Sequence, residues 1–257
     1  MSALYRKSEV LFAVLWIVVY VVLFSLADQV SGVVGVQKSV TLAVGVLLTT
    51  ILVVWMKNNS LFVKYGLCKS ALKPKQVLYY LPLVFLASVN VWFGVAWNFS
   101  LIETVFYILS MLLVGFLEEI IFRGLLFKAM CKDGIKSAVI VSSVTFGIGH
   151  LVNLVNGSSA DLRSNLLQVV SAIAIGFLFT VLFWKSGSLL ACIVTHGVLN
   201  GLSAVADQSA MTPVRECVIT SVMMVVALVY AWYVIRKCYD NIDSTEVPEF
   251  DKKENCE

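Results

Sequence analysis

Charged residues are scarce in this chain of 257 residues, because Asp, Glu, Lys and Arg together make up only 14% of it. A soluble globular protein carries about 25% charged residues. Hydrophobic residues account for 60%, and apolar runs long enough to cross a bilayer recur along the chain. This shortage of charge excludes an ordinary soluble domain and indicates a polytopic membrane protein. The net charge of +3 is spread unevenly over the loops and gives no reason to expect nucleic-acid binding.

The cysteines lack the spacing of a metal or redox site. No CxxC pair occurs, and most cysteines fall in or beside apolar segments: Cys68, Cys131, Cys192, Cys217, Cys238 and Cys256. We therefore expect free thiols rather than disulfides or a cysteine zinc site. The HExxH pattern of many zinc proteases is absent as well, and no internal repeat is evident.

The apolar segments predict an all-α fold, a bundle of about eight transmembrane helices. A helix needs about 20 residues to cross roughly 30 Å of hydrocarbon. The expected spans are 9–27, 39–56, 77–97, 104–127, 137–155, 166–184, 188–206 and 217–235. The first apolar run has no small-residue cleavage site, so we expect it to remain as a transmembrane helix.

The distribution of Lys and Arg predicts the topology. Fifteen of these residues fall in the termini and in the loops expected on the same side, whereas the opposite loops contain only Lys38, Arg163 and Arg215. Basic loops stay on the cytoplasmic side. Both termini are therefore expected to be cytoplasmic. A bacterial plasma membrane fits this multi-pass chain, with the endoplasmic reticulum as the location if the chain is eukaryotic.

Four parts are expected along the chain. Residues 1–103 contain the first three helices, residues 104–206 form a functional core of four helices, and residues 207–237 contain the eighth helix. Residues 238–257 are rich in Asp and Glu. This last stretch is expected to be a disordered, solvated tail.

Five ionisable side chains interrupt the apolar spans: Glu118, Glu119, Arg123, His150 and His196. A charged group at membrane depth costs about 2.5–3.5 kcal/mol on insertion scales, and such groups usually face the interior of a helix bundle. The chain contains only two histidines, and both lie within apolar spans. One buried histidine could simply join two helices by a hydrogen bond, but two histidines with a carboxylate pair favour a functional site.

Helical geometry assigns different roles to the two glutamates. Glu119 and Arg123 are four residues apart and about 40° apart around a helix, so they can form an ion pair. Glu118 lies about 140° from Arg123 and can face a polar cavity. His196 and Asn200 share one face in the same way. Gly147 and Gly149, just before His150, would allow another helix to approach closely.

The expected depths of these groups agree only in part. At about 1.5 Å per residue, Glu118 and His196 lie about 13 and 12 Å from the cytoplasmic end of their helices. His150 lies nearer 20 Å on the same count, so a tilt, a later helix start or a break at glycine would be needed to bring it level. We expect the three groups to share a cavity that opens toward the cytoplasmic half of the membrane.

Three short patterns occur in order on successive apolar segments: EEIIFR at 118–123, FGIGH at 146–150 and HGVLN at 196–200. Together they resemble the EExxxR, FxxxH and HxxxN/D motifs of the CPBP or Abi family of intramembrane proteases, which includes the type II CAAX prenyl endopeptidases and bacteriocin-processing proteins. The resemblance covers residues 104–206. It implies that Glu118 activates a water with the help of His150, and that His196 and Asn200 stabilise the oxyanion.

The resemblance leaves the metal question open. Glu118, His150 and His196 could form a three-ligand zinc site with a fourth position free. The same residues also suit a metal-free glutamate mechanism, which we favour because a carboxylate in a partly dry cavity is a good general base.

The sequence therefore predicts an intramembrane endopeptidase that cleaves a membrane-associated peptide or protein. The alternative is a non-catalytic binding or bacteriocin-immunity protein with the same fold. A transporter with a proton path is disfavoured, because the inverted repeat of many transporters is missing. The bilayer is an expected partner, and neither the substrate nor the oligomeric state follows from the sequence.

Overall fold

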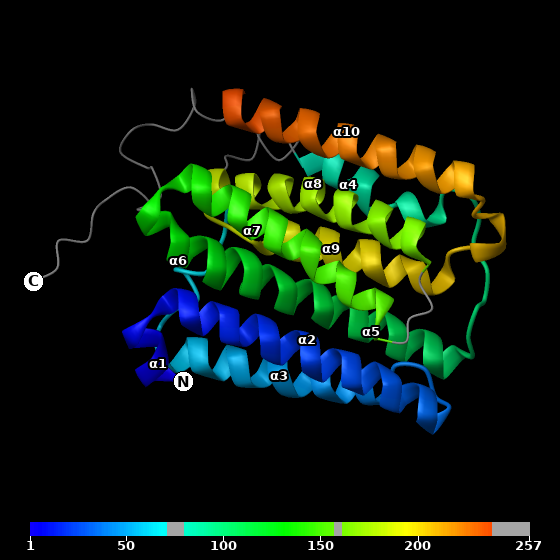
Figure 1. Cartoon of the computed structure of the whole chain (residues 1–257), viewed down its shortest axis with the longest axis horizontal. Helices are drawn as coiled ribbons and strands as arrows, with labels where there is room; N and C mark the ends of the chain where they lie inside the picture. The colour runs from blue at the N-terminus through cyan, green and yellow to red at the C-terminus, as the bar shows by residue number, and fades with distance from the viewer. Residues whose placement is uncertain (71–79, 157–160, 238–257) are drawn as a thin grey trace, which may run out of the picture.

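The computed structural model describes residues 1–70, 80–156 and 161–237, which form an all-helical bundle (Figure 1). The α-helices within these ranges are α1 (Ser2–Lys7), α2 (Glu9–Val34), α3 (Ser39–Asn58), α4 (Leu81–Ala87), α5 (Leu101–Glu118), α6 (Lys128–Met130), α7 (Ile135–Gly149), α8 (Leu162–Ser186), α9 (Leu190–Leu202) and α10 (Pro213–Lys237). Helix α5 packs against α3 and α9, α7 packs against α8, and α8 packs against α10.

Six helical stretches in the described ranges are long and apolar enough to cross a membrane: Glu9–Val34, Ser39–Asn58, Leu101–Asp133, Ile135–Leu154, Leu162–Ser186 and Pro213–Arg236. The prediction of an all-α chain with several membrane spans is confirmed. Two of the eight expected spans, 77–97 and 188–206, do not form helices of that length. The second of these contains α9 and a short 3₁₀ turn, Ser203–Val205.

The expected helix over 77–97 is wrong for residues 80–97, while residues 71–79 lie outside the described ranges. Helix α4 ends after seven residues, and a 3₁₀ turn follows at Val89–Val91. Gly94 then adopts φ +125°, a backbone conformation that residues other than glycine rarely adopt. The Asp207 backbone N–H donates to the Gly94 carbonyl, and the Asn90 amide donates to the Leu199 carbonyl at 2.6 Å. Residues 90–94 thus form hydrogen bonds with the end of α9 and with the loop after it, in place of the hydrogen bonds of a continued helix.

Side-chain caps explain where two of the long helices begin. Ser100 accepts a hydrogen bond from the backbone N–H of Glu103, and the Glu103 carboxylate accepts one from the backbone N–H of Ser100. This reciprocal capping box starts α5. Asp161 accepts hydrogen bonds from the N–H groups of Arg163 and Ser164 at the start of α8.

Helix α5 continues directly into a π-helix at Glu119–Phe127. All nine residues of this π-helix are buried. A π-helix inserts extra residues per turn and is frequent at functional sites. The first glutamate of the pair therefore ends a regular α-helix, and the second begins the π-helix.

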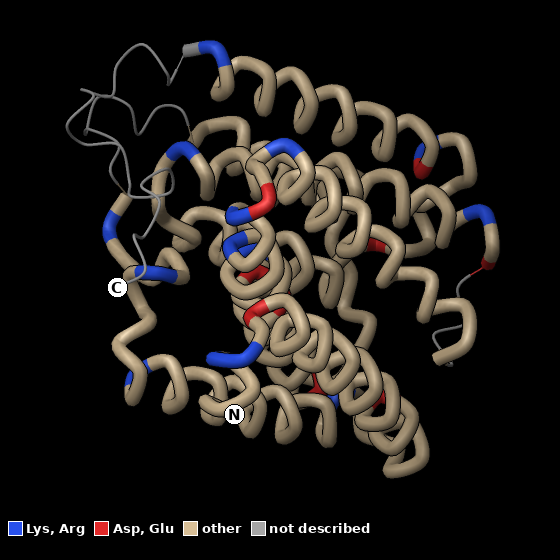
Figure 2. Tube along the Cα trace, turned by 60° about the vertical axis from the view of Figure 1, so that its left-hand side comes forward, with Lys and Arg blue, Asp and Glu red and all other residues tan. Residues whose placement is uncertain are grey.

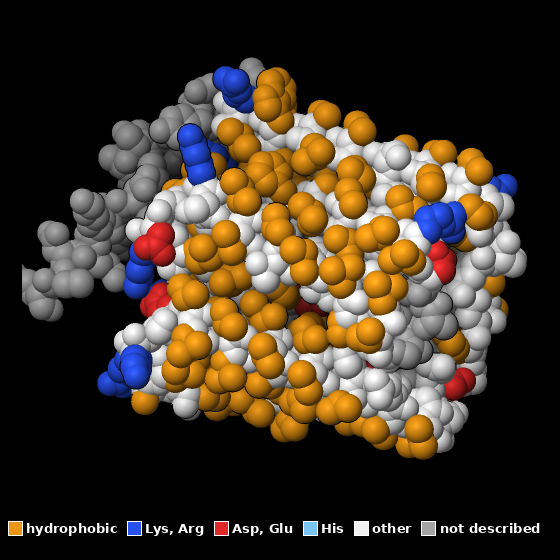
Figure 3. Space-filling view, in the orientation of Figure 1, with side chains coloured by type: hydrophobic (Ala, Val, Ile, Leu, Met, Phe, Trp, Pro, Cys, Tyr) orange, Lys and Arg blue, Asp and Glu red, His pale blue; other side chains and the backbone are white. Residues whose placement is uncertain are grey.

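Helix α2 begins and α10 ends at the same end of the bundle (Figure 1). Most Lys and Arg residues lie toward one side of the molecule in Figure 2. Hydrophobic side chains cover much of the visible face between the two ends of the bundle in Figure 3. These features suit a chain that crosses a membrane, while the side on which the termini lie remains a prediction.

Four cysteines of the described ranges are free thiols: Cys68, Cys131, Cys192 and Cys217. Cys238 and Cys256 lie outside these ranges, as does the whole expected tail, 238–257.

Candidate active site

The expected ion pair is present in the interior. Arg123 Nη1 lies 3.0 Å from Glu119 Oε1, and both side chains are completely buried. The guanidinium carbon of Arg123 lies 4.1 Å from the centre of the Phe146 ring, a distance at which a cation and an aromatic face attract each other. Gly176 leaves room for this arrangement, since a Cβ there would lie 2.9 Å from Arg123 Nη2.

His196 connects the two glutamates. Its Nδ1 lies 2.8 Å from Glu119 Oε1, and its Nε2 lies 3.3 Å from Glu118 Oε2. A carboxylate only accepts hydrogen bonds, so Nδ1 carries the proton in the contact with Glu119. The sequence indicated separate directions for the glutamates but not that one imidazole would contact both.

The cluster brings two carboxylates, one guanidinium and one imidazole together in the bundle interior. Isolated charge in an apolar interior is costly, whereas paired charge is tolerated. The ion pair of Glu119 and Arg123 therefore makes the buried cluster tolerable, and His196 Nε2 faces Glu118.

Two glycines bring these groups together. A Cβ at Gly115 would lie 2.6 Å from the backbone nitrogen of Gly197, so α5 and α9 touch through their backbones. Gly147 gives α7 the same kind of contact with α8, since its Cβ would lie 2.9 Å from the Val169 carbonyl oxygen. The expected close approach therefore occurs at Gly147, whereas Gly149 has no neighbour within 4 Å.

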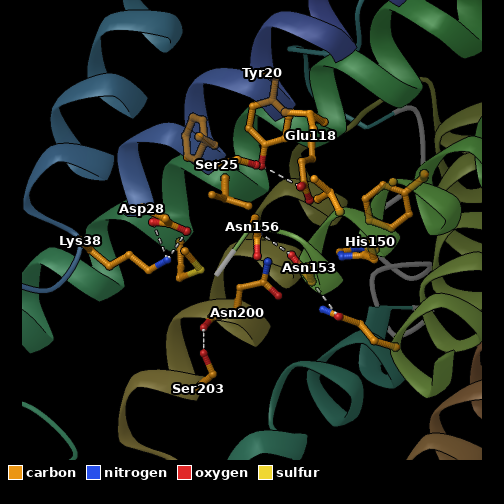
Figure 4. Close-up of a pocket in the computed structure, with 18 of the residues that line it drawn as sticks. Tyr20, Ser25, Asp28, Lys38, Glu118, His150, Asn153, Asn156, Asn200 and Ser203 are labelled. Atoms are coloured by element: carbon orange, nitrogen blue, oxygen red, sulfur yellow. Dashed lines mark hydrogen bonds and ion pairs between the residues drawn. The ribbon is translucent and has the colours of Figure 1, made fainter. Parts of the chain in front are cut away.

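Glu118 lies on the wall of a cavity of about 430 Å³ (Figure 4). The carboxylate is nearly buried, and its Oε1 accepts a hydrogen bond of 2.7 Å from the hydroxyl of Tyr20 on α2. His150 and Asn200 line the same cavity. Three of the predicted site residues thus border one space.

His150 lies at a change in helix type. The α-helix ends at Gly149, and a 3₁₀-helix begins at His150. The change comes only at His150 itself, so the depth count along an α-helix still holds as far as Gly149. The Phe146 ring centre lies 5.3 Å from the His150 ring centre and 5.7 Å from that of His196. Phe146, expected only to pack, lies in edge contact with both imidazoles.

The cavity extends from Glu118 toward the end of the bundle opposite the start of α2. Its lining there includes Asp28, Lys38, Asn153 and Ser203, which lie near the α2–α3 connection and the ends of α7 and α9 (Figure 4). The buried π-helix follows Glu118 on the other side, so packing closes the cavity there. On the predicted topology the cavity extends toward the outer end, and the side of the membrane on which it opens stays a prediction.

A second cavity of about 320 Å³ adjoins the first between α8, α9, α10 and the turn after α4. The two cavities share Asn90, Phe146, His150, Gln168 and Asn200. The lining of the second includes a group of aliphatic side chains beside its polar ones: Leu167, Ile175, Leu199, Ile219 and Met223. His150 and Asn200 consequently lie where the two cavities meet.

No three His, Cys, Asp or Glu side chains in residues 1–70, 80–156 and 161–237 are grouped closely enough to hold a metal ion. The alternative zinc set of Glu118, His150 and His196 does not form such a group. His196 is instead oriented by Glu119, and Glu118 by Tyr20. The possible three-ligand zinc set is therefore not assembled in this arrangement, and the question of a metal stays open.

Tyr20 is the contact that sequence reasoning missed. Its position in the middle of the first apolar span is a usable signal, since tyrosines that anchor a helix in the interface lie near span ends. The partner could not have been named, because Tyr20 and Glu118 are 98 residues apart.

Comparison with known proteins agrees with this arrangement. Residues 98–202 match the family described as type II CAAX prenyl endopeptidase Rce1-like, and no curated protein and no solved structure matches the chain. The matched segment contains every predicted site residue and leaves α2, α3 and α10 outside. Residues 98–202 are therefore a domain of the Rce1-like type II CAAX prenyl endopeptidase (CPBP) family, a family of intramembrane proteases.

Proposed function

We propose that this protein is an intramembrane endopeptidase that hydrolyses peptide bonds of a membrane-associated peptide or protein. The observation that carries this proposal is the nearly buried carboxylate of Glu118 on the wall of a cavity that His150 and Asn200 also line. Family membership supports the same class of reaction.

Glu118 is the proposed general base. Its carboxylate removes a proton from a water molecule, and the water oxygen then forms a bond to the substrate carbonyl carbon. The C–N bond breaks as the proton passes to the leaving nitrogen. His150, on the same cavity wall, orients the water.

His196 and Asn200 are the proposed stabilisers of the oxyanion. The imidazole of His196 beside Glu118 and the side-chain amide of Asn200 can both donate hydrogen bonds. Donors held in place before the reaction stabilise the charge that develops in the transition state. Glu119 and Arg123 have a supporting role, because they hold the His196 ring in one orientation.

The adjoining cavities suit an extended substrate. A peptide bond beside His150 has chain on both sides, and open space lies on both sides of this residue. The aliphatic side chains of the second cavity favour a substrate with an aliphatic side chain next to the cleaved bond, since burial of apolar area stabilises binding by about 25 cal/mol per Å².

The test is cleavage by purified protein in proteoliposomes, together with peptide mass spectrometry of cells that express wild type or Glu118→Ala. We expect Glu118→Gln and Glu118→Ala to abolish cleavage at unchanged protein level. Glu103→Gln is the matched control, because this carboxylate is on the same helix, is partly exposed and caps the helix in a role that Gln also fills. Biological function that survives Glu118→Ala would instead support the binding or immunity alternative.

A further inference from the structure

Tyr20 reaches the proposed active site from outside the family segment. It lies in the middle of α2, is only 6% exposed, and donates its hydroxyl to Glu118 Oε1 at 2.7 Å (Figure 4). The family match covers residues 98–202 and does not include α2. The amino-terminal part of the chain therefore contributes a polar contact to the centre of the site.

The two oxygens of Glu118 have different surroundings. Oε1 is occupied by the Tyr20 hydroxyl, whereas Oε2 is buried, has no hydrogen-bond partner within the described ranges and lies 3.3 Å from His196 Nε2. A carboxylate free to rotate would exchange these two positions. The Tyr20 bond removes that freedom and leaves Oε2 beside the imidazole.

We propose that Tyr20 is a positioning residue for peptide hydrolysis, which holds the Glu118 carboxylate in the orientation in which it takes the proton from water. This inference rests on the proposed function of Glu118. Hydrogen bonds to a charged group are about twice as strong as neutral ones, so one such bond can orient a buried carboxylate. Helix α2 thus completes the active site.

Packing alone is the competing explanation, and the structure allows the two to be separated. The Tyr20 ring centre lies 4.6 Å from that of Phe24, and the ring is buried. Tyr20→Phe keeps this ring contact and removes only the hydroxyl. A role in packing would leave the rate of this variant unchanged.

The experiment compares kcat and KM of wild type and Tyr20→Phe in proteoliposomes, with a peptide that wild type cleaves in a Glu118-dependent manner. We expect kcat to fall on the order of 10- to 100-fold, as for loss of a hydrogen bond to a charged group, with KM within twofold. Tyr5→Phe is the matched control. Its hydroxyl, on α1 near the start of α2, accepts a hydrogen bond from Lys64 at 2.8 Å, so the kcat of this variant should stay within twofold.

Two further measurements separate positioning from binding and folding. In the inactive Glu118→Gln background, adding Tyr20→Phe should leave peptide binding within twofold, because Tyr20 acts through Glu118. Replacing Tyr20 with 3-fluorotyrosine keeps the hydroxyl and should restore kcat to within a few fold of wild type, even if Tyr20→Phe folds poorly.

Several outcomes would overturn the inference. Unchanged kcat in Tyr20→Phe would make Tyr20 a packing residue, and a weaker peptide affinity with constant kcat would make it a substrate contact. Failure of 3-fluorotyrosine to restore kcat would also contradict it. If wild type shows no cleavage that depends on Glu118, the proposed function itself fails, which is a different result from cleavage that needs Glu118 but not the Tyr20 hydroxyl.

Discussion

At the scale of single residues, the buried guanidinium of Arg123 constrains the site most tightly. Its side chain is completely buried, and Nε and Nη2 have no hydrogen-bond partner within the described ranges. Its charge is compensated by one carboxylate, Glu119, and by the face of the Phe146 ring. Removing one member of such a pair leaves an uncompensated buried charge.

We therefore predict that Glu119→Gln lowers protein stability much more than Glu118→Gln. Loss of the carboxylate charge opposite Arg123 should lower the free energy of unfolding by about 3 kcal/mol or more. The measurements are protein abundance in membranes and the midpoint of thermal unfolding in detergent. Glu118→Gln is the control, since Glu118 faces a cavity and its loss should affect activity first. Equal abundance and equal loss of activity in the two variants would contradict this division of roles.

At the scale of helices, the site depends on the distance between α5 and α9. Glu118 and Glu119 stand at the junction of α5 and the π-helix, and His196 stands on α9. The backbone contact between Gly115 and Gly197 determines how closely these groups approach. Small residues at a helix interface permit such contact within a membrane.

Gly115→Ala should therefore separate α5 from α9 and destabilise the protein. The added Cβ would lie 2.6 Å from a backbone nitrogen that cannot move independently. Overpacking of this kind costs about 1–3 kcal/mol. We expect a lower midpoint of unfolding and at least tenfold lower cleavage. Gly32→Ala serves as the control, because nothing lies within 4 Å of a Cβ at that position. Similar behaviour of the two variants would show that the helix contact is unimportant.

Helix α10 provides a test of the second cavity. Ile219 lines this cavity, so Ile219→Trp should fill part of it. The kcat/KM for peptides with a large aliphatic residue beside the cleaved bond should fall about tenfold, which corresponds to roughly 1.4 kcal/mol of transition-state stabilisation. Peptides with alanine at this position should be less affected. The measurement is the ratio of kcat/KM for the two peptides.

The control is Val225→Trp, which adds the same side chain at a position on α10 that is 60% exposed. This variant should leave the ratio unchanged. An unchanged ratio in Ile219→Trp would argue against a substrate role for the cavity.

At the scale of the whole molecule, the start of α2 and the end of α10 share one end of the bundle (Figure 1). The excess of Lys and Arg in the termini and their neighbouring loops predicts that this end is cytoplasmic. The cavity beside Glu118 would then extend toward the outer face, which makes the orientation important for where substrates approach.

Labelling of single-cysteine variants tests this orientation. Cys256 should react with a membrane-impermeant thiol reagent only after the cells are permeabilised. Cys217, exposed near the start of α10 at the opposite end, should be the more reactive in intact cells. Reaction of Cys256 in intact cells would reverse the predicted topology, with no effect on the internal geometry of the site.

Features that depend on neighbours along the chain could be predicted from the sequence alone. The apolar runs predicted a helical membrane protein, and the four-residue spacing of Glu119 and Arg123 predicted their ion pair. The three ordered motifs indicated the family domain and the residues that now line the cavity or lie beside it. Local spacing determines these features because a helix imposes the same geometry wherever it forms.

Contacts between distant segments were decided only by the tertiary structure. The bond from Tyr20 to Glu118 joins residues 98 positions apart, and His196 contacts Glu119 across 77 positions. The shortness of α4 and the direction in which the cavity extends likewise depend on what each segment meets. The physical reason is that the sequence determines which face of a helix is polar, whereas packing against other helices determines which groups that face contacts.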